Sequence, residues 1–159
     1  APAPRDVSPP RPRKRVTARL AGATASAKST LLRCVAGLTS FEGPARVLGA
    51  TPRSAQGRSL IGYLPQLVAL PESVTVGEVV AFFARLRGVR VRNPDELAAA
   101  VPISDGFLPP LARPIGAPSV GMRRRVALAV ALLGSPPLAL LDEPAASLDA
   151  SHRASAWEL

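Results

Sequence analysis

Three short stretches, far apart in the sequence, hold the residue types that could do chemistry together. Residues 21–32 read AGATASAKSTLL, which approximates the phosphate-binding loop G-x-x-x-x-G-K-[ST] with Ala27 in the place of the second glycine. In such a loop, backbone N–H groups and a helix N-terminus attract phosphate, a lysine reaches the β- and γ-phosphates, and a hydroxyl group serves Mg²⁺. The alternative is an ordinary strand–helix turn with a chance Lys-Ser pair. The phosphate-binding interpretation assigns this role to Gly22, Ala23, Thr24, Ala25, Ser26, Ala27, Lys28, Ser29 and Thr30.

Two adjacent carboxylates follow an apolar run near the end of the sequence. Residues 138–144 read LALLDEP, so apolar residues lead directly into Asp142 and Glu143. An acid at the tip of a buried strand needs a cation or a hydrogen-bond donor to offset its lost hydration. Asp142 is therefore a candidate Mg²⁺ ligand, and Glu143 can face a γ-phosphate and polarise the attacking water as general base. The alternative is an acid that caps the following turn, which explains one carboxylate better than two.

The third stretch is an apolar helix with a basic beginning. Residues 118–133 read PSVGMRRRVALAVALL, and Ser119 is placed to cap the helix. Its N-terminus is a second position that attracts an anion. Arg123, Arg124 and Arg125 cover more than half a helical turn, so at least one of them must face outward. The same pattern is typical of an amphipathic core helix with a basic face, and we expect this helix to be that as well.

The elements that must position these stretches alternate between strands and helices. Apolar patterns predict strands at residues 16–22, 45–49, 59–65 and 138–142. Helices are predicted at residues 29–36, 76–87, from Pro94 onward, 120–133 and from 149 onward. This alternation predicts an α/β layered domain with a mainly parallel sheet, and the run of strand-poor sequence at 71–116 predicts a helical insert.

Composition and charge favour a globular domain behind a basic leader. The chain has 159 residues and 47% apolar residues, and it carries a formal charge of +9. Residues 1–15 are rich in proline and arginine, which predicts a solvated, disordered leader; a basic tail that binds nucleic acid or anionic lipid is the alternative. No nucleic-acid partner is expected, because aromatic stacking platforms and a binding motif are missing. No run reaches the ~18 apolar residues of a membrane span.

The order and spacing of the motifs resemble the nucleotide-binding subunit of ABC transporters. AGATASAKSTLL looks like Walker A, and YLPQ, which ends at Gln66, looks like the Q-loop. PSVGMRRRVALAVALL looks like the signature loop and its helix, LALLDEP like Walker B, and AASLD like the D-loop. The text SVTVGEVVAFFARLRGV after the Q-loop is more similar to drug or multidrug exporters than to importers. The resemblance covers about residues 16–159, with a helical subdomain at about 71–133.

The resemblance implies a P-loop NTPase of ABC type with a three-layer core, which uses ATP and Mg²⁺. It assigns Mg²⁺ to Ser29, Gln66 and Asp142, and the role of general base to Glu143. Ser119, Val120 and Gly121 would form the signature loop that meets the γ-phosphate bound to the opposite subunit of a homo- or heterodimer. The partner implied is a transmembrane permease subunit, which would hold the chain at the cytoplasmic face of the cell membrane.

The sequence departs from the family pattern chiefly at glycines. Ala25 and Ala27 replace glycines in the phosphate loop, Val120 in the signature loop and Ser147 in the D-loop. A Cβ in a loop that needs φ > 0 costs about 1–2 kcal/mol per residue and crowds the approach to phosphate. A switch histidine and an adenine-stacking aromatic are not found, so we expect a degenerate domain that is incomplete at both ends. The expected function is ATP binding with weak or lost hydrolysis; the alternatives are a non-hydrolysing binding or regulatory module and a decayed fragment.

Overall fold

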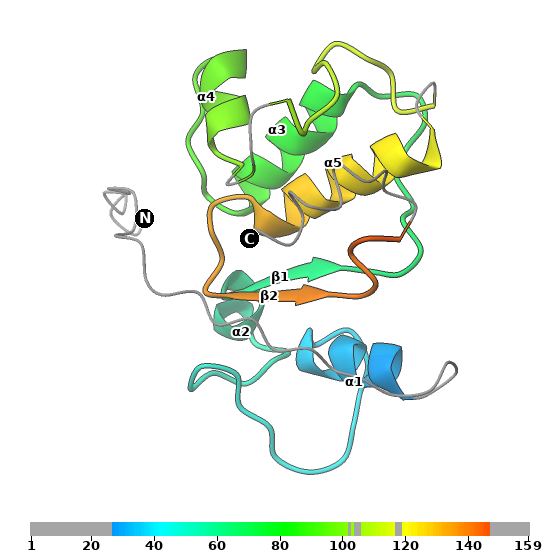
Figure 1. Ribbon diagram of the computed structural model, residues 1–159. Coiled ribbons are helices and arrows are strands. Elements are labelled where there is room, and N and C mark those ends of the chain that lie inside the picture. The colour runs from blue at the N-terminus through cyan, green and yellow to red at the C-terminus, as the bar shows by residue number, and fades with distance from the viewer. Residues whose placement is uncertain (1–26, 102, 104–105, 117–118, 147–159) are drawn as a thin grey trace.

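The computed structural model describes residues 27–101, 103, 106–116 and 119–146. In chain order, these form a set of helices with two strands (Figure 1): α1 Lys28–Val35, α2 Ala55–Ser59, β1 Ile61–Leu64, α3 Val76–Leu86, α4 Pro94–Ala99, α5 Val120–Leu132 and β2 Leu138–Leu141. Helices α3, α4 and α5 lie on one face of the strand pair, and α1 lies on the other (Figure 1). The predicted α/β architecture with helix, sheet and helix layers is confirmed.

The two described strands are parallel neighbours. Their register pairs Ile61 with Leu138 and Leu64 with Leu141, so both strands end at the same edge. Parallel strands need a long crossover, and here it is formed by α3, α4 and α5. Helix α5 lies so close to β1 that a Cβ at Gly62 would collide with the carbonyl oxygen of Ala131. Glycine at this position lets the helix and the strand approach each other.

Helix α5 is buried from both sides. One apolar cluster joins it to α3 and α4, and its fully buried members include Val80, Ile115 and Val126. A second cluster joins it to β1 and contains Leu64, Leu128, Ala131 and Leu132. The helix was expected to be amphipathic with a basic face, but from Val126 to its end all of its residues except the half-buried Val130 are buried. It is the central element between the helical layer and the strands.

The ends of the helices follow the predicted local signals. The Thr75 hydroxyl oxygen accepts a hydrogen bond from the Glu78 N–H at 3.2 Å, and Glu78 Oε2 accepts one from the Thr75 N–H at 2.7 Å, which completes the capping box. Asn93 Oδ1 accepts from the Glu96 N–H at 2.8 Å, with Pro94 in the first turn of α4. Ser119 Oγ accepts from the Met122 N–H at 3.3 Å. The predicted starts of α3, α4 and α5 are confirmed.

Near the first helix, one local prediction fails and one element was missed. Residues 45–49 do not form a strand, because Leu48 and Gly49 take positive φ values of 50° and 84° and close a tight turn between Val47 and Ala50. Helix α2, which begins after the N-cap Ser54, was not predicted. The strand expected at 16–22, the helix expected from 149 and the leader at 1–15 lie outside the described residues. Within the described part, no helix combines the length and apolarity that crossing a membrane requires.

Candidate functional site

The predicted phosphate-binding residues that the structure describes lie at the start of α1. Lys28 and Ser29 are half-buried in its first turn and Thr30 is exposed. Ala27 is the N-cap residue and offers no side-chain acceptor to the first N–H groups of the helix. Uncapped N–H groups at a helix N-terminus attract anions. This end of α1 can therefore receive a phosphate, while residues 22–26 of the loop lie outside the described residues.

Ala27 does not have the backbone that the sequence comparison led us to expect. Its φ is −66° and its ψ is 14°, a conformation open to any residue. The expected cost of a Cβ in a left-handed backbone is therefore wrong at this position. Ala25, the other replaced glycine of the loop, is not among the described residues.

The Q-loop and Walker B residues meet at the carboxyl ends of the two strands. Gln66 follows β1 at an exposed position, and Asp142 and Glu143 follow β2 directly. The Asp142 N–H donates to the carbonyl oxygen of Leu64 at 2.9 Å, which continues the parallel ladder beyond the strands. Asp142 is 6% exposed, whereas Glu143 is exposed to solvent. The structure thus brings these three predicted residues together at the carboxyl-terminal ends of β1 and β2, a position called the strand edge below.

The start of α1 lies on the same side of the molecule as this edge (Figure 1). Side chains alternate along β1, so Tyr63 points away from the face on which Leu64 packs against α5. Burial raises the pKa of Tyr63, the negative charge of Asp142 raises it further, and Arg33 of α1 lowers it. These influences place α1, β1 and Asp142 in one electrostatic neighbourhood.

Arg124, which sequence reasoning did not single out, joins the two strand ends. Its side chain is 4% exposed. Nη1 donates to the carbonyl oxygens of Pro65 at 2.7 Å and of Gln66 at 2.6 Å. Nη2 donates to the carbonyl oxygens of Asp142 and, at 2.7 Å, of Glu143. Burial lowers the pKa of Arg124, and the carboxylates of Asp142 and Glu143 act in the opposite direction.

Glu143 has an unusual backbone that these bonds support. Its φ is 51°, in the left-handed region that a residue with a side chain adopts at a cost of about 1–2 kcal/mol. Arg124 Nη2 donates to the carbonyl oxygens of both Asp142 and Glu143, so hydrogen bonds from α5 restrain the backbone on each side of the Glu143 Cα atom. The residue proposed as general base is thus held in a defined backbone conformation. The sequence gives only a faint signal for the role of Arg124, because it is one of three consecutive arginines and nothing marks which of them is buried.

The predicted signature residues lie at the start of α5. Ser119 and Val120 are exposed, and Gly121 is half-buried. Because Ser119 Oγ accepts from Met122, its hydroxyl hydrogen is still available to donate to a second oxygen. Val120 is 62% exposed, so its side chain stands in solvent where the family pattern has a bare glycine backbone.

The donor set fits a magnesium ion better than a softer metal. Ser29 offers a hydroxyl, Gln66 an amide oxygen and Asp142 a carboxylate, all of them hard oxygen ligands. Among the described residues, no group of three His, Cys, Asp or Glu residues could hold a metal by itself. Mg²⁺ is usually held by one or two carboxylates together with phosphate oxygens and water, so the residues present fit this ion.

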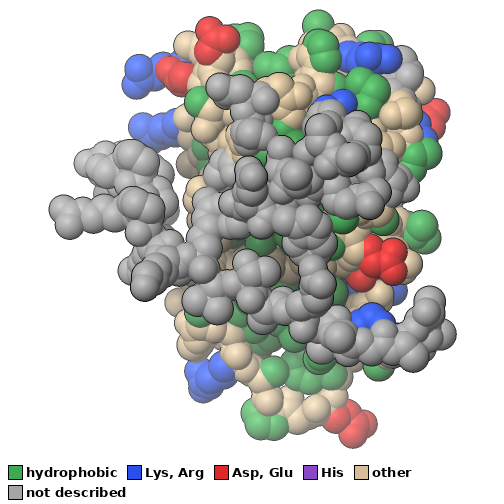
Figure 2. All heavy atoms as spheres, viewed as in Figure 1, with side chains coloured by type: hydrophobic (Ala, Val, Ile, Leu, Met, Phe, Trp, Pro, Cys, Tyr) green, Lys and Arg blue, Asp and Glu red, His purple; other side chains and the backbone are tan. Residues whose placement is uncertain are grey.

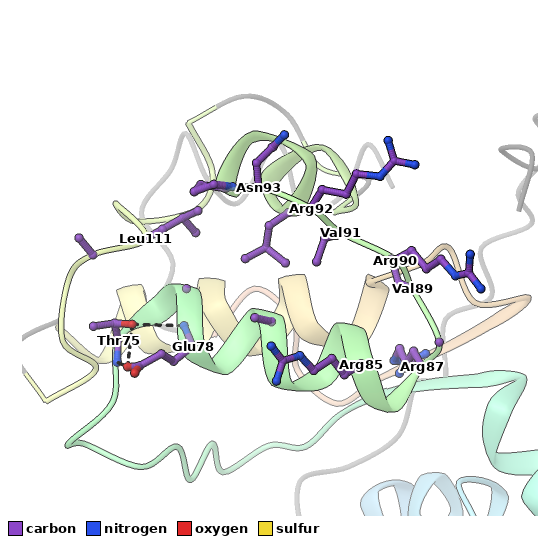
Figure 3. Close-up of a pocket in the computed structure, with 16 residues that line it drawn as sticks. Thr75, Glu78, Arg85, Arg87, Val89, Arg90, Val91, Arg92, Asn93 and Leu111 are labelled. Carbon is purple, nitrogen blue, oxygen red and sulfur yellow. Dashed lines mark hydrogen bonds between the residues drawn. The ribbon is translucent and has the colours of Figure 1, made fainter.

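A basic groove lies elsewhere, along α3 and the segment that connects it to α4. Its volume is about 1180 Å³, and Figure 3 shows Arg85, Arg90 and Arg92 around it, with the Thr75–Glu78 capping box at one end. None of the predicted site residues lines this groove. The space-filling view shows basic side chains scattered over the visible described surface, without one continuous patch (Figure 2).

The fold and the site define a class of protein: a P-loop NTPase with helices on both faces of a parallel sheet and acidic residues at the carboxyl ends of its strands. The chain belongs to the ABC transporter family, whose sequence profile matches residues 12–146. Relatives that it matches are named as ATP-binding proteins of this family.

Curated relatives agree with this assignment. The chain is 34% identical over 143 residues to the probable multidrug ABC transporter ATP-binding protein YbhF of Escherichia coli (strain K12), covering 88% of this chain and 25% of that protein. It is 37% identical over 145 residues to the Nod factor export ATP-binding protein I of Sinorhizobium fredii, covering 87% and 41%. The chain thus spans a quarter to less than half of the length of these two relatives.

Solved structures agree in fold. A putative ABC transporter ATP-binding protein from Pyrococcus furiosus superposes with a TM-score of 0.69 at 26% identity, covering 86% of this chain and 66% of that one. The dimeric ATP-binding cassette MJ0796 bound to ADP and Pi gives a TM-score of 0.66 at 23% identity, covering 82% and 62%. The second likeness concerns the fold alone.

Proposed function

We propose that this chain binds ATP with Mg²⁺ as the motor subunit of an ABC-type exporter and hydrolyses it weakly. The observation that carries the proposal is the meeting of Gln66, Asp142 and Glu143 at the strand edge, on the side of the molecule where α1 begins. Polar residues at the carboxyl ends of parallel strands, beside a helix N-terminus, suit a phosphate ligand.

The first turn of α1 and the loop before it would hold the phosphates. Lys28 supplies a positive charge to the β- and γ-phosphate oxygens, and the N–H groups around Ser29 and Thr30 donate to them. Gly22, Ala23, Thr24, Ala25, Ser26 and Ala27 complete this loop in the proposal.

The strand edge would hold the metal and the water. Ser29, Gln66 and Asp142 would hold Mg²⁺, and the ion would supply positive charge to offset that of the phosphates. Glu143, exposed beside the edge, takes a proton from the attacking water as general base. The burial of Asp142 beside the guanidinium of Arg124 keeps its carboxylate close to a positive charge.

The partners follow from the class of protein. The signature residues Ser119, Val120 and Gly121 would contact the γ-phosphate held by a second ATP-binding domain in a homo- or heterodimer. A transmembrane permease subunit would hold the chain at the cytoplasmic face of the membrane. The export direction rests on the named relatives, a probable multidrug protein and a Nod factor export protein. In this arrangement residues 16–159 would be the ATP-binding domain, with a helical subdomain at about 71–133.

The signature loop, and not Ala27, is the reason to expect weak hydrolysis. Val120 presents a β-branched side chain, 62% exposed, where the opposing nucleotide would meet glycine backbone. Such bulk hinders the close approach that the dimer needs for turnover. The same observation favours a second candidate, a non-hydrolysing binding or regulatory module.

The test is to measure ATP binding and ATP hydrolysis by the purified full chain with Mg²⁺. Binding with slow turnover agrees with the proposal, and binding without turnover selects the regulatory module. No detectable ATP binding at millimolar nucleotide would contradict both. Turnover at the rate of intact transporter subunits would overturn the claim of weak hydrolysis.

A further inference from the structure

Arg124 and Asp142 are the buried polar or charged residues of the described chain, and both lie at the strand edge. The Arg124 guanidinium donates four hydrogen bonds to backbone carbonyl oxygens, two beyond β1 and two beyond β2. The cation therefore fixes the paths of two loops instead of pairing directly with one carboxylate.

Burying this cation is not an efficient way to stabilise a core. A charged group removed from water carries a large desolvation cost, and no described residue accepts a hydrogen bond from the buried Nε of Arg124. The second apolar cluster, which contains Leu64 and Leu128, already joins α5 to β1. The bonds of Arg124 add a restraint on the segments that carry Gln66, Asp142 and Glu143.

The position of Arg124 in α5 also connects these two loops to the signature residues at the start of the helix. Arg124 lies five residues after Ser119, which is about 7.5 Å along the helix axis. The same helix thus carries the proposed signature residues at its beginning and, about one and a half turns later, the guanidinium that donates hydrogen bonds to both loops.

We propose that Arg124 is a positioning residue for the ATP site: by holding the backbone of the Q-loop and Walker B segments, it places the side chains of Gln66 and Asp142 around the magnesium ion. The inference rests on the proposed ATP–Mg²⁺ site. A purely structural role would weaken ATP binding equally with and without Mg²⁺. A positioning role predicts that loss of Arg124 weakens ATP binding in Mg²⁺ more than ATP binding without Mg²⁺.

The experiment compares two dissociation constants for ATP, one in Mg²⁺ and one in EDTA, for the full chain and its variants. In R124M, the tightening of ATP binding by Mg²⁺ should fall about tenfold, as removal of an outer support of a metal site typically does. Binding in EDTA, which depends on the first turn of α1, should stay within about twofold of wild type, because those groups are not touched. R124K should recover part of the Mg²⁺ effect, since its ammonium can reach some of the carbonyl oxygens.

The matched control is R85M, which removes an exposed guanidinium from α3 and should change neither constant. If R124M does not fold, R124K carries the test, with a Mg²⁺ effect smaller than in wild type. An unchanged Mg²⁺ effect in folded R124M, or equal losses in Mg²⁺ and EDTA, would overturn the positioning role. A wild-type chain that does not bind ATP at all would instead overturn the proposed function.

Discussion

The strand edge and the start of α1 would serve the same nucleotide, but they are built in different ways. The strand edge is held by contacts between residues far apart in the sequence: Arg124 to Gln66 and to Glu143, and Asp142 to Leu64. The start of α1 is held by its own helix, and its N-cap residue Ala27 adds no side-chain bond. The signature residues at the start of α5 are likewise held by their own helix, through the local cap that Ser119 forms.

The difference shows where the altered residues can be tolerated. Ala27 and Val120 replace family glycines in the two locally built regions, and neither has a positive φ. The charged and polar groups proposed for chemistry are present, and three of them lie where long-range contacts fix the backbone. We infer that Val120 affects how closely a phosphate approaches, that Ala27 does so little, and that both leave the arrangement of the strand edge intact.

The largest effect on chemistry is expected at Glu143. Glu143→Gln removes the proposed general base, so hydrolysis should fall about 10²–10⁴-fold. ATP affinity should change little, because the amide has the same size as the carboxylate. A phosphate-release assay beside an ATP titration measures both. Hydrolysis equal to that of wild type would show that Glu143 is not the base.

A paired substitution in the core tests the contrast in stability. Leu128→Ala removes a fully buried side chain between α5 and β1 and should lower the free energy of unfolding by about 2–5 kcal/mol. Leu31→Ala in α1, where the side chain is 50% exposed, should cost less than about 1 kcal/mol. Urea denaturation followed by circular dichroism measures both values. Similar losses would mean that α1 is as tightly integrated as α5.

The next effect is on ATP affinity at the start of α1. Lys28→Ala removes the positive charge proposed to meet the phosphates, and charged hydrogen bonds of this kind correspond to about a 10- to 100-fold change in the dissociation constant. The unfolding midpoint should stay close to that of wild type, because Lys28 is only half-buried. Unchanged affinity would remove α1 from the site.

The smallest effect is expected at Ala27. Because its φ is −66°, Ala27→Gly relieves no backbone strain, and ATP affinity should change less than about twofold. Val120→Gly, in the exposed signature loop, is the contrasting variant and should raise hydrolysis several-fold in the dimer. Competition with a fluorescent nucleotide measures the first and phosphate release the second. A large gain in affinity from Ala27→Gly would show that the Cβ crowds the phosphate.

Local signals in the sequence predicted what is locally determined. The caps at Thr75, Asn93 and Ser119 depend on residues three positions apart, and all three form as expected. The family resemblance implied that Gln66 belongs with Asp142 and Glu143, and the strand register brings the three residues together. The ordered family motifs predicted the fold class before any contact was known.

What the sequence could not show depends on contacts across the fold. Choosing Arg124 among three adjacent arginines requires knowing how α5 rotates against the strands, which its apolar neighbours decide. The strand expected at 45–49 failed because Leu48 takes a turn conformation that its apolar pattern hides. The negative φ of Ala27 likewise follows from its place at the helix start, not from its residue type.

The central claim is that the start of α1 and the strand edge hold the same Mg²⁺–ATP. A double-mutant cycle with Ser29→Ala and Asp142→Asn tests it most directly, with ATP affinity measured in Mg²⁺ and in EDTA. If both residues serve one metal ion, their losses in Mg²⁺ should be non-additive by about 1 kcal/mol, and this coupling should vanish in EDTA. Additive losses in Mg²⁺ would contradict the account, because they would place the two residues at separate sites.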